Sequence, residues 1–227
     1  MIFYFVKFFE EQKYADDFLN GILYINRLSF FKKIEDDVKT NRGDKYEGVH
    51  TWLQPNMVEL QFGNIAINPK DLAAPVCIQK NIHDNLNVFC LYAGHTGGLV
   101  SGTEEKLRQQ LTIREDNLHL GDQAVIVTKP EKFLNRVKDT VRVNNYGMKA
   151  KIVEYYDPEK FHGSFNEDDV IFKKRFEFQH QSEYRIAVDT RTNGNTAIRL
   201  DIGNIGDIAQ QFDIQDFNKE FKFDFKE

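Results

Sequence analysis

The sequence predicts an α+β protein, a single domain over residues 1–227 with a largely antiparallel, twisted sheet and short helices. Three observations predict this class. Apolar runs of strand length recur along the whole chain, and two pairs of them flank short turns that contain Gly and Asn. The helical patterns are short, and they lack the regular alternation with strands that a doubly wound fold requires. No internal repeat or long linker divides the chain.

The first elements follow from local patterns. A strand is predicted over the aromatic-rich residues 2–9, and a short helix over 10–21 carries Tyr14 and Phe18 four residues apart and ends at Gly21. Further elements are then expected in chain order: a strand over 22–26, a short helix over 30–36 capped by Ser29, and a polar loop over 39–48.

The middle of the chain begins with a hairpin. Val58, Leu60 and Phe62 face Ile65 and Ile67 across a Gly63-Asn64 turn within residues 57–68. The remaining segments of the middle region are expected as strands over 85–94, 123–128 and 148–157, and as helices over 103–111 and 129–139, the second with Pro130 in its first turn.

In the last third, a short helix is predicted over 168–178, followed by a second hairpin. Its strands are expected at 185–189 and 197–202, joined by the turn TRTNGN. Two short helical pieces, 205–212 and 214–221, are expected to close the domain.

The stretch QSEYRIAVD, 181–189, alternates in character. Tyr184, Ile186 and Val188 point one way and are predicted to enter the core, as successive strand residues face opposite sides. Glu183 and Arg185 share the other face, together with Gln181. This pattern predicts a half-buried strand, and we expect Glu183 and Arg185 to pair.

A second charged cluster lies in RGDKYEG, residues 42–48. It is composed of Arg42, Asp44, Lys45, Tyr46 and Glu47. Most charged runs of this kind are solvated surface loops. The alternative is that these side chains converge with Glu183 and Arg185 in one polar cleft and form a binding site.

Several kinds of site are disfavoured. Cys77, His83, Cys90 and His95 are metal-binding types, but structural zinc sites need a tight Cys-x2–4-Cys knuckle, which is absent. We therefore expect no metal, and reduced, unpaired thiols. The Gly-rich loop 94–102 has no P-loop lysine, and no hydrolase or zincin motif occurs.

The net charge and the length of the apolar N-terminal segment limit the kinds of partner that are expected. A net charge of −5 provides no global basic field, so nucleic acid binding is disfavoured. The apolar N-terminus is too short to span a bilayer and has no basic segment before it. We expect a cytoplasmic protein without membrane association. Its oligomeric state stays open.

Two blocks resemble a family of uncharacterised bacterial and phage-encoded domains. The first is YADDFLNGILYINRLSFFKKIEDD…RGDKYEG, residues 14–48, and the second is FKKRFEFQHQSEYRIAV, residues 172–188. They occur in the order typical of that family. Some distant relatives lie near phage-resistance genes, so the resemblance implies a role in phage–host conflict.

Gln181-Ser182-Glu183 is also similar to the Q-x-E motif of ADP-ribosyltransferases. The resemblance implies NAD as cosubstrate, with Glu183 as the key carboxylate and Gln181 orienting the target side chain. A fixed carboxylate would stabilise the positive charge that develops as nicotinamide leaves. Those enzymes usually end the first strand with Arg or His, where this chain has Lys7. Tyr92 or Tyr46 would stand for their middle motif.

Two classes of function follow. One is a binding or interaction module that needs no cofactor and acts on a protein partner or a nucleotide ligand. The other is an NAD-dependent transferase that uses Glu183. A strongly perturbed carboxylate in a deep cleft would favour the enzyme. A flat surface with an exposed aromatic patch would favour the module.

Overall fold

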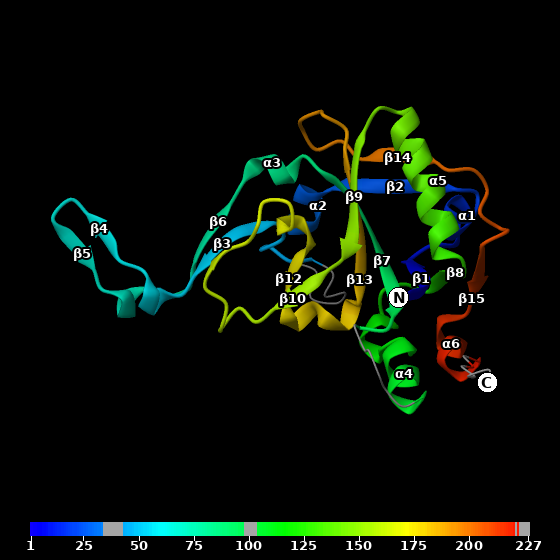
Figure 1. The fold of residues 1–227 in the computed structure, drawn as a ribbon, viewed down its shortest axis with the longest axis horizontal. Helices are drawn as coiled ribbons and strands as arrows, with labels where there is room; N and C mark the ends of the chain where they lie inside the picture. Colours follow the sequence, from blue (N-terminus) through cyan, green and yellow to red (C-terminus); the bar gives the residue numbers. More distant parts are fainter. Residues whose placement is uncertain (34–42, 98–103, 221, 223–227) are drawn as a thin grey trace.

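The computed structural model describes residues 1–33, 43–97, 104–220 and 222, and an eight-stranded sheet dominates it (Figure 1). Its strands are β1 (Ile2–Phe9), β2 (Ile22–Arg27), β7 (Asn87–His95), β8 (Gln123–Val127), β9 (Gly147–Ile152), β13 (Glu183–Asp189), β14 (Ile198–Asp201) and β15 (Ala209–Phe212). The main path runs β14-β2-β7-β1-β8-β15, with β13 beside β7 and β9 beside β13. Every pairing in this sheet is antiparallel, which confirms the predicted fold class.

Two amphipathic helices supply much of the core beside the sheet. They are α1 (Gln12–Leu19) and α5 (Pro130–Val143). Helix α5 buries Phe133, Val137 and Val141, which recur every four residues and so form one stripe. Helix α1 ends at Leu19, and the predicted terminator Gly21 follows two residues later with φ 86°. A Cβ there would lie 2.0 Å from the carbonyl oxygen of Gly203, so glycine is required.

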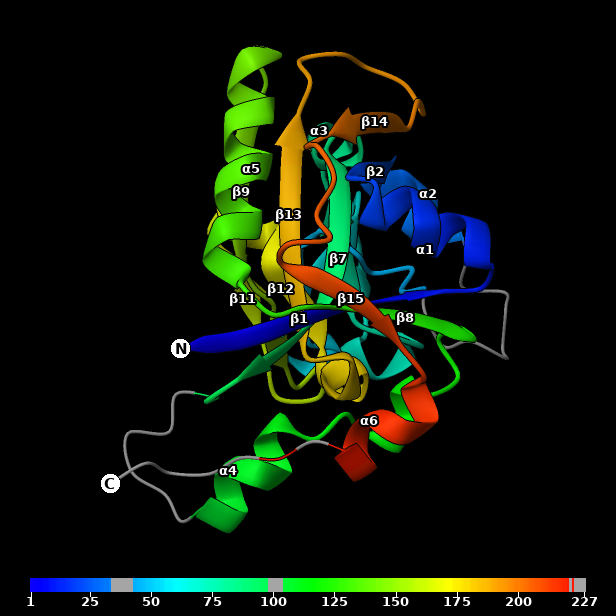
Figure 2. The same cartoon turned by 90° about the vertical axis from the view of Figure 1, so that its right-hand side faces the viewer.

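Strand β7 lies at a fork in the sheet. Along one edge it pairs with β13 from Asn87 to Tyr92. Along the other edge it pairs with β2 at Asn87 and Val88, and with β1 from Tyr92 to His95. Between these contacts, Phe89 to Leu91 have no strand partner on that edge among the described residues. Helix α1 connects β1 and β2, the two strands that diverge along this edge (Figure 2).

The predicted helix over 168–178 is wrong. This segment forms a 3-10 turn η5 (Val170–Phe172), strand β12 (Lys173–Arg175) and the start of a second turn η6 (Phe176–Gln181). Val170, Ile171 and Phe172 are all buried in succession, which a helix on a surface cannot achieve. Strand β12 pairs in parallel with β10 (Glu154–Tyr156).

The predicted second hairpin is also wrong. β13 has β7 on one edge and β9 on the other, so no edge is left for β14. Strand β14 pairs with β2 instead. The expected helical piece over 205–212 contains β15, which extends the sheet beyond β8.

Ser29 does not cap a helix. It lies inside α2 (Leu28–Lys33), where its hydroxyl donates to Asn195 Oδ1 at 3.2 Å. The helix is entered directly from β2, so there is no intervening cap position for Ser29. The predicted continuation of this helix over 34–36 lies outside the described residues.

A smaller substructure projects from the main sheet (Figure 1). Strands β3 (Val49–Leu53), β6 (Val76–Gln79) and β11 (Gly163–Ser164) form a three-stranded sheet. Beyond it lies the predicted hairpin, β4 (Leu60–Phe62) and β5 (Ile65–Ile67), whose Phe62–Ile65 and Leu60–Ile67 pairing is confirmed. The other short elements are η2 (Pro55–Met57), η3 (Pro69–Asp71), α3 (Asn81–Asp84), α4 (Glu104–Leu111), η4 (Glu115–Asn117) and α6 (Ile214–Glu220). Of the helices in the described parts of the chain, none is long and apolar enough to cross a membrane.

Candidate functional site

Strand β13 is buried on both faces. Tyr184, Ile186 and Val188 lie in the core as predicted. Glu183 and Arg185, on the other face, are only 4% and 1% exposed, so the predicted half-buried strand is wrong. The loop before β3 and strand β12 cover this face. A charge in such a position is costly unless it is paired.

Four side chains meet beneath this cover and form an ion cluster: Glu47, Lys174, Glu183 and Arg185. Arg185 binds both carboxylate oxygens of Glu47, at 2.8 Å through Nη1 and 3.0 Å through Nη2. Its Nε donates to Glu183 Oε1 at 2.7 Å. Lys174 Nζ lies 3.1 Å from Glu47 Oε1 and 3.2 Å from Glu183 Oε2. The predicted meeting of the RGDKYEG loop with Arg185 is therefore confirmed.

The cluster balances two cations against two carboxylates. Burial opposes ionisation of Glu183, but Arg185 and Lys174 outweigh it and hold the pKa of this carboxyl well below its usual range. The same balance lowers the pKa of Glu47. All four groups are therefore charged at neutral pH, and each charge depends on its partners.

The other predicted residues of the loop have different positions. Asp44 is buried and accepts from Arg175, at 3.1 Å from Nε and 2.8 Å from Nη2. The Tyr46 ring packs on Arg175 and against Trp52, and Lys45 is exposed. Arg42 lies outside the described residues. Of the described members of this group, Glu47 is the one that reaches Arg185. Asp44 binds Arg175, the residue of β12 that follows Lys174.

Lys174 and Arg175 were missed because their segment was interpreted as a helix. In β12 the side chains alternate, which turns Lys174 into the cluster between two half-buried neighbours. The signal available in the sequence was the cationic run KKR directly after the apolar VIF. Two buried carboxylates in β13 and the loop require more than one cation.

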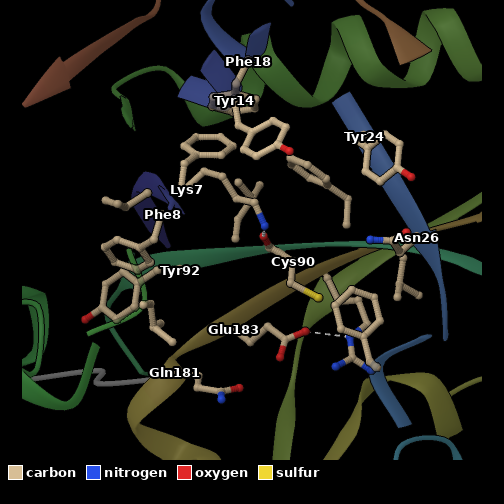
Figure 3. A pocket seen from close by; sticks show the side chains of 18 of the residues that line it. Lys7, Phe8, Tyr14, Phe18, Tyr24, Asn26, Cys90, Tyr92, Gln181 and Glu183 are labelled. Atoms are coloured by element: carbon tan, nitrogen blue, oxygen red, sulfur yellow. Dashed lines mark hydrogen bonds and ion pairs between the residues drawn. The ribbon is translucent and has the colours of Figure 1, made fainter. Parts of the chain in front are cut away.

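A cleft of about 600 Å³ opens above the ion cluster, at the fork beside β7 (Figure 3). Its walls are aromatic, with Tyr14 and Phe18 from α1 on one side and Phe8 and Tyr92 on another. All four members of the cluster contribute to the lining, as do Gln181, Cys90, Lys7 and Asn26. Gln181 precedes β13 in η6 and accepts from Lys174 Nζ at 2.7 Å. Tyr46 does not line the cleft.

Lys7 reaches across the fork. Its Nζ donates to the carbonyl oxygen of Cys90 at 2.9 Å and lies 4.8 Å from the centre of the Phe89 ring. The ammonium group thus occupies a position where a neighbouring strand would otherwise donate to β7.

Both cysteines are free, as predicted. Cys90 lies in the cleft beside Glu183, and burial together with the negative charge of Glu183 raises the pKa of its thiol to about 12. Since the thiolate is the reactive form, Cys90 should be inert at neutral pH.

Thiol labelling checks this directly. We expect Ellman's reagent at pH 8 to modify Cys90 far more slowly in the folded protein than after unfolding in guanidinium. The Cys77→Ser variant removes the second thiol, so that the signal reports Cys90 alone. Labelling of that variant at equal rates in the folded and unfolded states would contradict the description of Cys90 as a protonated, unreactive thiol.

The described Cys and His residues of metal-binding types do not form a cluster. Among the described residues, no group of three or more His, Cys, Asp or Glu side chains could hold a metal ion. His83 instead contacts Glu167, its Nε2 lying 2.9 Å from Oε1 of that carboxylate.

Comparisons of the chain with known protein families, with curated proteins and with solved structures found no match. The fold and the site thus define the class of the protein by themselves: an antiparallel α+β protein with an aromatic cleft over a buried, neutral ion cluster.

Proposed function

We propose that this protein is a cytoplasmic binding module of phage–host conflict whose cleft holds a nucleotide-sized ligand with a planar ring. The observation that carries the proposal is the joining of an aromatic wall and a fixed polar floor in one cavity of about 600 Å³. This size lies within the range of small-molecule sites, and such sites combine apolar walls with a few oriented polar groups. The role in phage–host conflict rests on the resemblance of residues 14–48 and 172–188.

The wall favours a flat ring. Tyr14 is half exposed on α1, and Phe18 and Phe89 lie deeper in the same cavity. Aromatic pairs gain about 0.5–1.5 kcal/mol beyond the burial of their area. A nucleobase or another heterocycle offers such a ring without the conformational cost of a flexible chain.

The floor favours a ligand that donates hydrogen bonds. Lys174 uses its three donors on Gln181, Glu183 and Glu47, so its ammonium has none left for an anion. Arg185 already makes four hydrogen bonds. Glu183, by contrast, keeps acceptor capacity, because a carboxylate offers about four lone-pair sites. Hydroxyl groups, such as those of a ribose, match this floor.

Binding explains the site better than acid–base catalysis. The Cys90 thiol is held protonated, and the Glu183 carboxyl is held ionised. No histidine lines the cavity in the part of the chain that the structure describes. A general acid or base needs a pKa near the working pH, and Cys90 and Glu183 are both far from it.

Calorimetric titration with adenosine, AMP and NAD tests the proposal. We expect at least one of them to bind the wild type, and Tyr14→Ala to weaken that binding by about tenfold through loss of the stacking surface. Phe176→Ala is the matched control, because Phe176 is exposed and does not line the cleft. Equal affinities for Tyr14→Ala and the wild type, or no binding of any of the three, would contradict the proposal.

A second candidate is an ADP-ribosyltransferase that uses NAD, and one observation favours it. Glu183 is ionised and lines the same cleft as Gln181, Lys7 and Tyr92. Stabilising a cationic transition state needs a fixed negative charge and no proton transfer. Incubation of labelled NAD with cell extract separates the candidates. Label transfer by the wild type that is lost in folded Glu183→Gln supports the enzyme, whereas NAD binding without transfer supports the module.

A further inference from the structure

An apolar arm projects from the body of the protein, away from the cleft. We define the arm as residues 54–75, between β3 and β6, with the β4–β5 hairpin at its tip (Figure 1). Large apolar side chains on it are open to solvent: Phe62 is 80% exposed, Ile65 68%, Met57 61% and Ile67 39%. None of the residues that line the cleft belongs to the arm.

The apolar side chains share one face of the hairpin. Phe62 pairs with Ile65 and Leu60 pairs with Ile67, so these four lie on the same side, while Gln61 and Ala66 occupy the other. A lone two-stranded hairpin is only marginally stable in water, and a one-sided apolar face gains stability when another surface covers it. In the described part of the chain, no element covers this face.

The root of the arm is held firmly. The side chain of Gln54 donates to the carbonyl oxygens of Pro158 at 2.7 Å and Phe161 at 2.8 Å. Trp52 donates to the same Pro158 carbonyl oxygen at 2.9 Å. Pro55 and Pro69 open the 3-10 turns on the two sides of the hairpin, and proline restricts the backbone there. A preorganised arm loses less entropy when it binds.

The charge of the arm limits the kinds of partner that could bind it. Its only ionic side chains are Glu59, Lys70 and Asp71. It therefore has no basic cluster for anionic lipid or nucleic acid.

The size of the exposed apolar surface further limits the kind of partner that could cover the arm. The four most exposed large apolar side chains of the whole arm are those of Phe62, Ile65, Met57 and Ile67. Together they offer on the order of 400 Å², about half of what one partner buries in a standard interface. Two arms face to face would thus be too small for a stable dimer. A groove that encloses the hairpin from several sides would bury more. We propose that the arm docks into an uncharged, apolar groove on another protein.

A photo-crosslinker locates the occupant. The full chain with p-benzoylphenylalanine in place of Phe62 is irradiated in cells of its native source, and the same group in place of Gln61 is the matched control on the opposite face. We expect one adduct with a different protein, stronger from position 62, whose cross-linked peptide maps to an apolar, uncharged groove. An adduct of twice the chain mass, or no protein adduct, would overturn the proposal.

Binding of the purified adduct partner then tests the chemistry. We expect the double variant Phe62→Ser/Ile65→Ser to bind at least about tenfold more weakly than the wild type. Gln61→Ser should bind like the wild type. The affinity should change little between 50 mM and 500 mM salt, since the contact is apolar. Equal binding by the double variant and the wild type would contradict the proposal, and so would an affinity that falls steeply with salt. Binding of the wild type to vesicles of phosphatidylcholine and phosphatidylglycerol that is lost in the double variant would also contradict it.

Discussion

Replacing Arg185 by methionine is expected to lower the free energy of unfolding by about 3–5 kcal/mol. The substitution removes the cation that binds both oxygens of Glu47 and one oxygen of Glu183. Lys174 alone would then face two carboxylates that are 1% and 4% exposed. Removing one partner of a buried pair is costly chiefly because the other charge stays buried without compensation. Urea denaturation at pH 7 measures the loss.

Arg199→Met is the matched control for this variant. Arg199 also pairs with a carboxylate, Asp17 at 3.4 Å, but its side chain is 63% exposed. Water and salt screen such a pair, so its loss should cost about 0–1 kcal/mol. If Arg185→Met is no less stable than Arg199→Met, the ion cluster is not a buried, coupled unit.

Glu47→Gln combined with Arg185→Met should cost less than the two single changes added together. Arg185 contacts Glu47 directly, and contacting residues couple by about 0.5–3 kcal/mol. Additive losses in this double variant would mean that the two residues stabilise the fold independently.

Truncating Ile186 to alanine is expected to cost about 2–5 kcal/mol, because it leaves a cavity in a close-packed core. Ile186 is fully buried, in the middle of a strand flanked on both edges. The neighbours cannot collapse easily onto the vacated space, since strands β7 and β9 fix the backbone on each side.

Ile82→Ala provides the comparison for the core variant. Ile82 is 67% exposed, and its truncation should change the free energy of unfolding by no more than about 0.5 kcal/mol. The denaturant midpoint of each variant gives the answer. An unchanged midpoint for Ile186→Ala would mean that this side chain does not pack in the core.

Local patterns predicted the elements whose partners lie nearby in the chain. Alternation identified the core residues of β13, and the Gly63-Asn64 turn identified the β4–β5 hairpin. Gly21, two residues after Leu19, marked the end of α1, and its φ is 86°. In each case a residue or a short period carries the information, and distant segments are not needed to interpret it.

Errors arose where distant segments decide the structure. The turn TRTNGN indicates a hairpin, yet β9 occupies the edge of β13 that the hairpin would need. The residues around the turn carry no signal for the pairing of β13 with β9. Residues 209–212 form β15 because β8 offers them an edge. Such pairings depend on the whole sheet, so neighbouring residues cannot specify them.

Only part of the site was predictable, because some of its residues come together through distant segments. Two charged segments without an evident local task, RGDKYEG and Glu183/Arg185, were expected to converge, and Glu47 does reach Arg185. Lys174 was not predicted as a site residue, because its segment was interpreted as a helix and the side-chain alternation of a strand was not considered. The aromatic walls come from α1, β1, β2 and β7, and only the fork beside β7 brings them together.

A crystal structure of the protein grown with a saturating concentration of the tightest-binding compound among adenosine, AMP and NAD tests the central claim most directly. We predict that its ring lies against Tyr14 and Phe18, and that a donor group lies within hydrogen-bond distance of the Glu183 carboxylate. The ion pairs from Arg185 to Glu47 and Glu183 should persist beneath it. A ligand bound elsewhere on the surface, with the cleft above the ion cluster empty, would contradict the account.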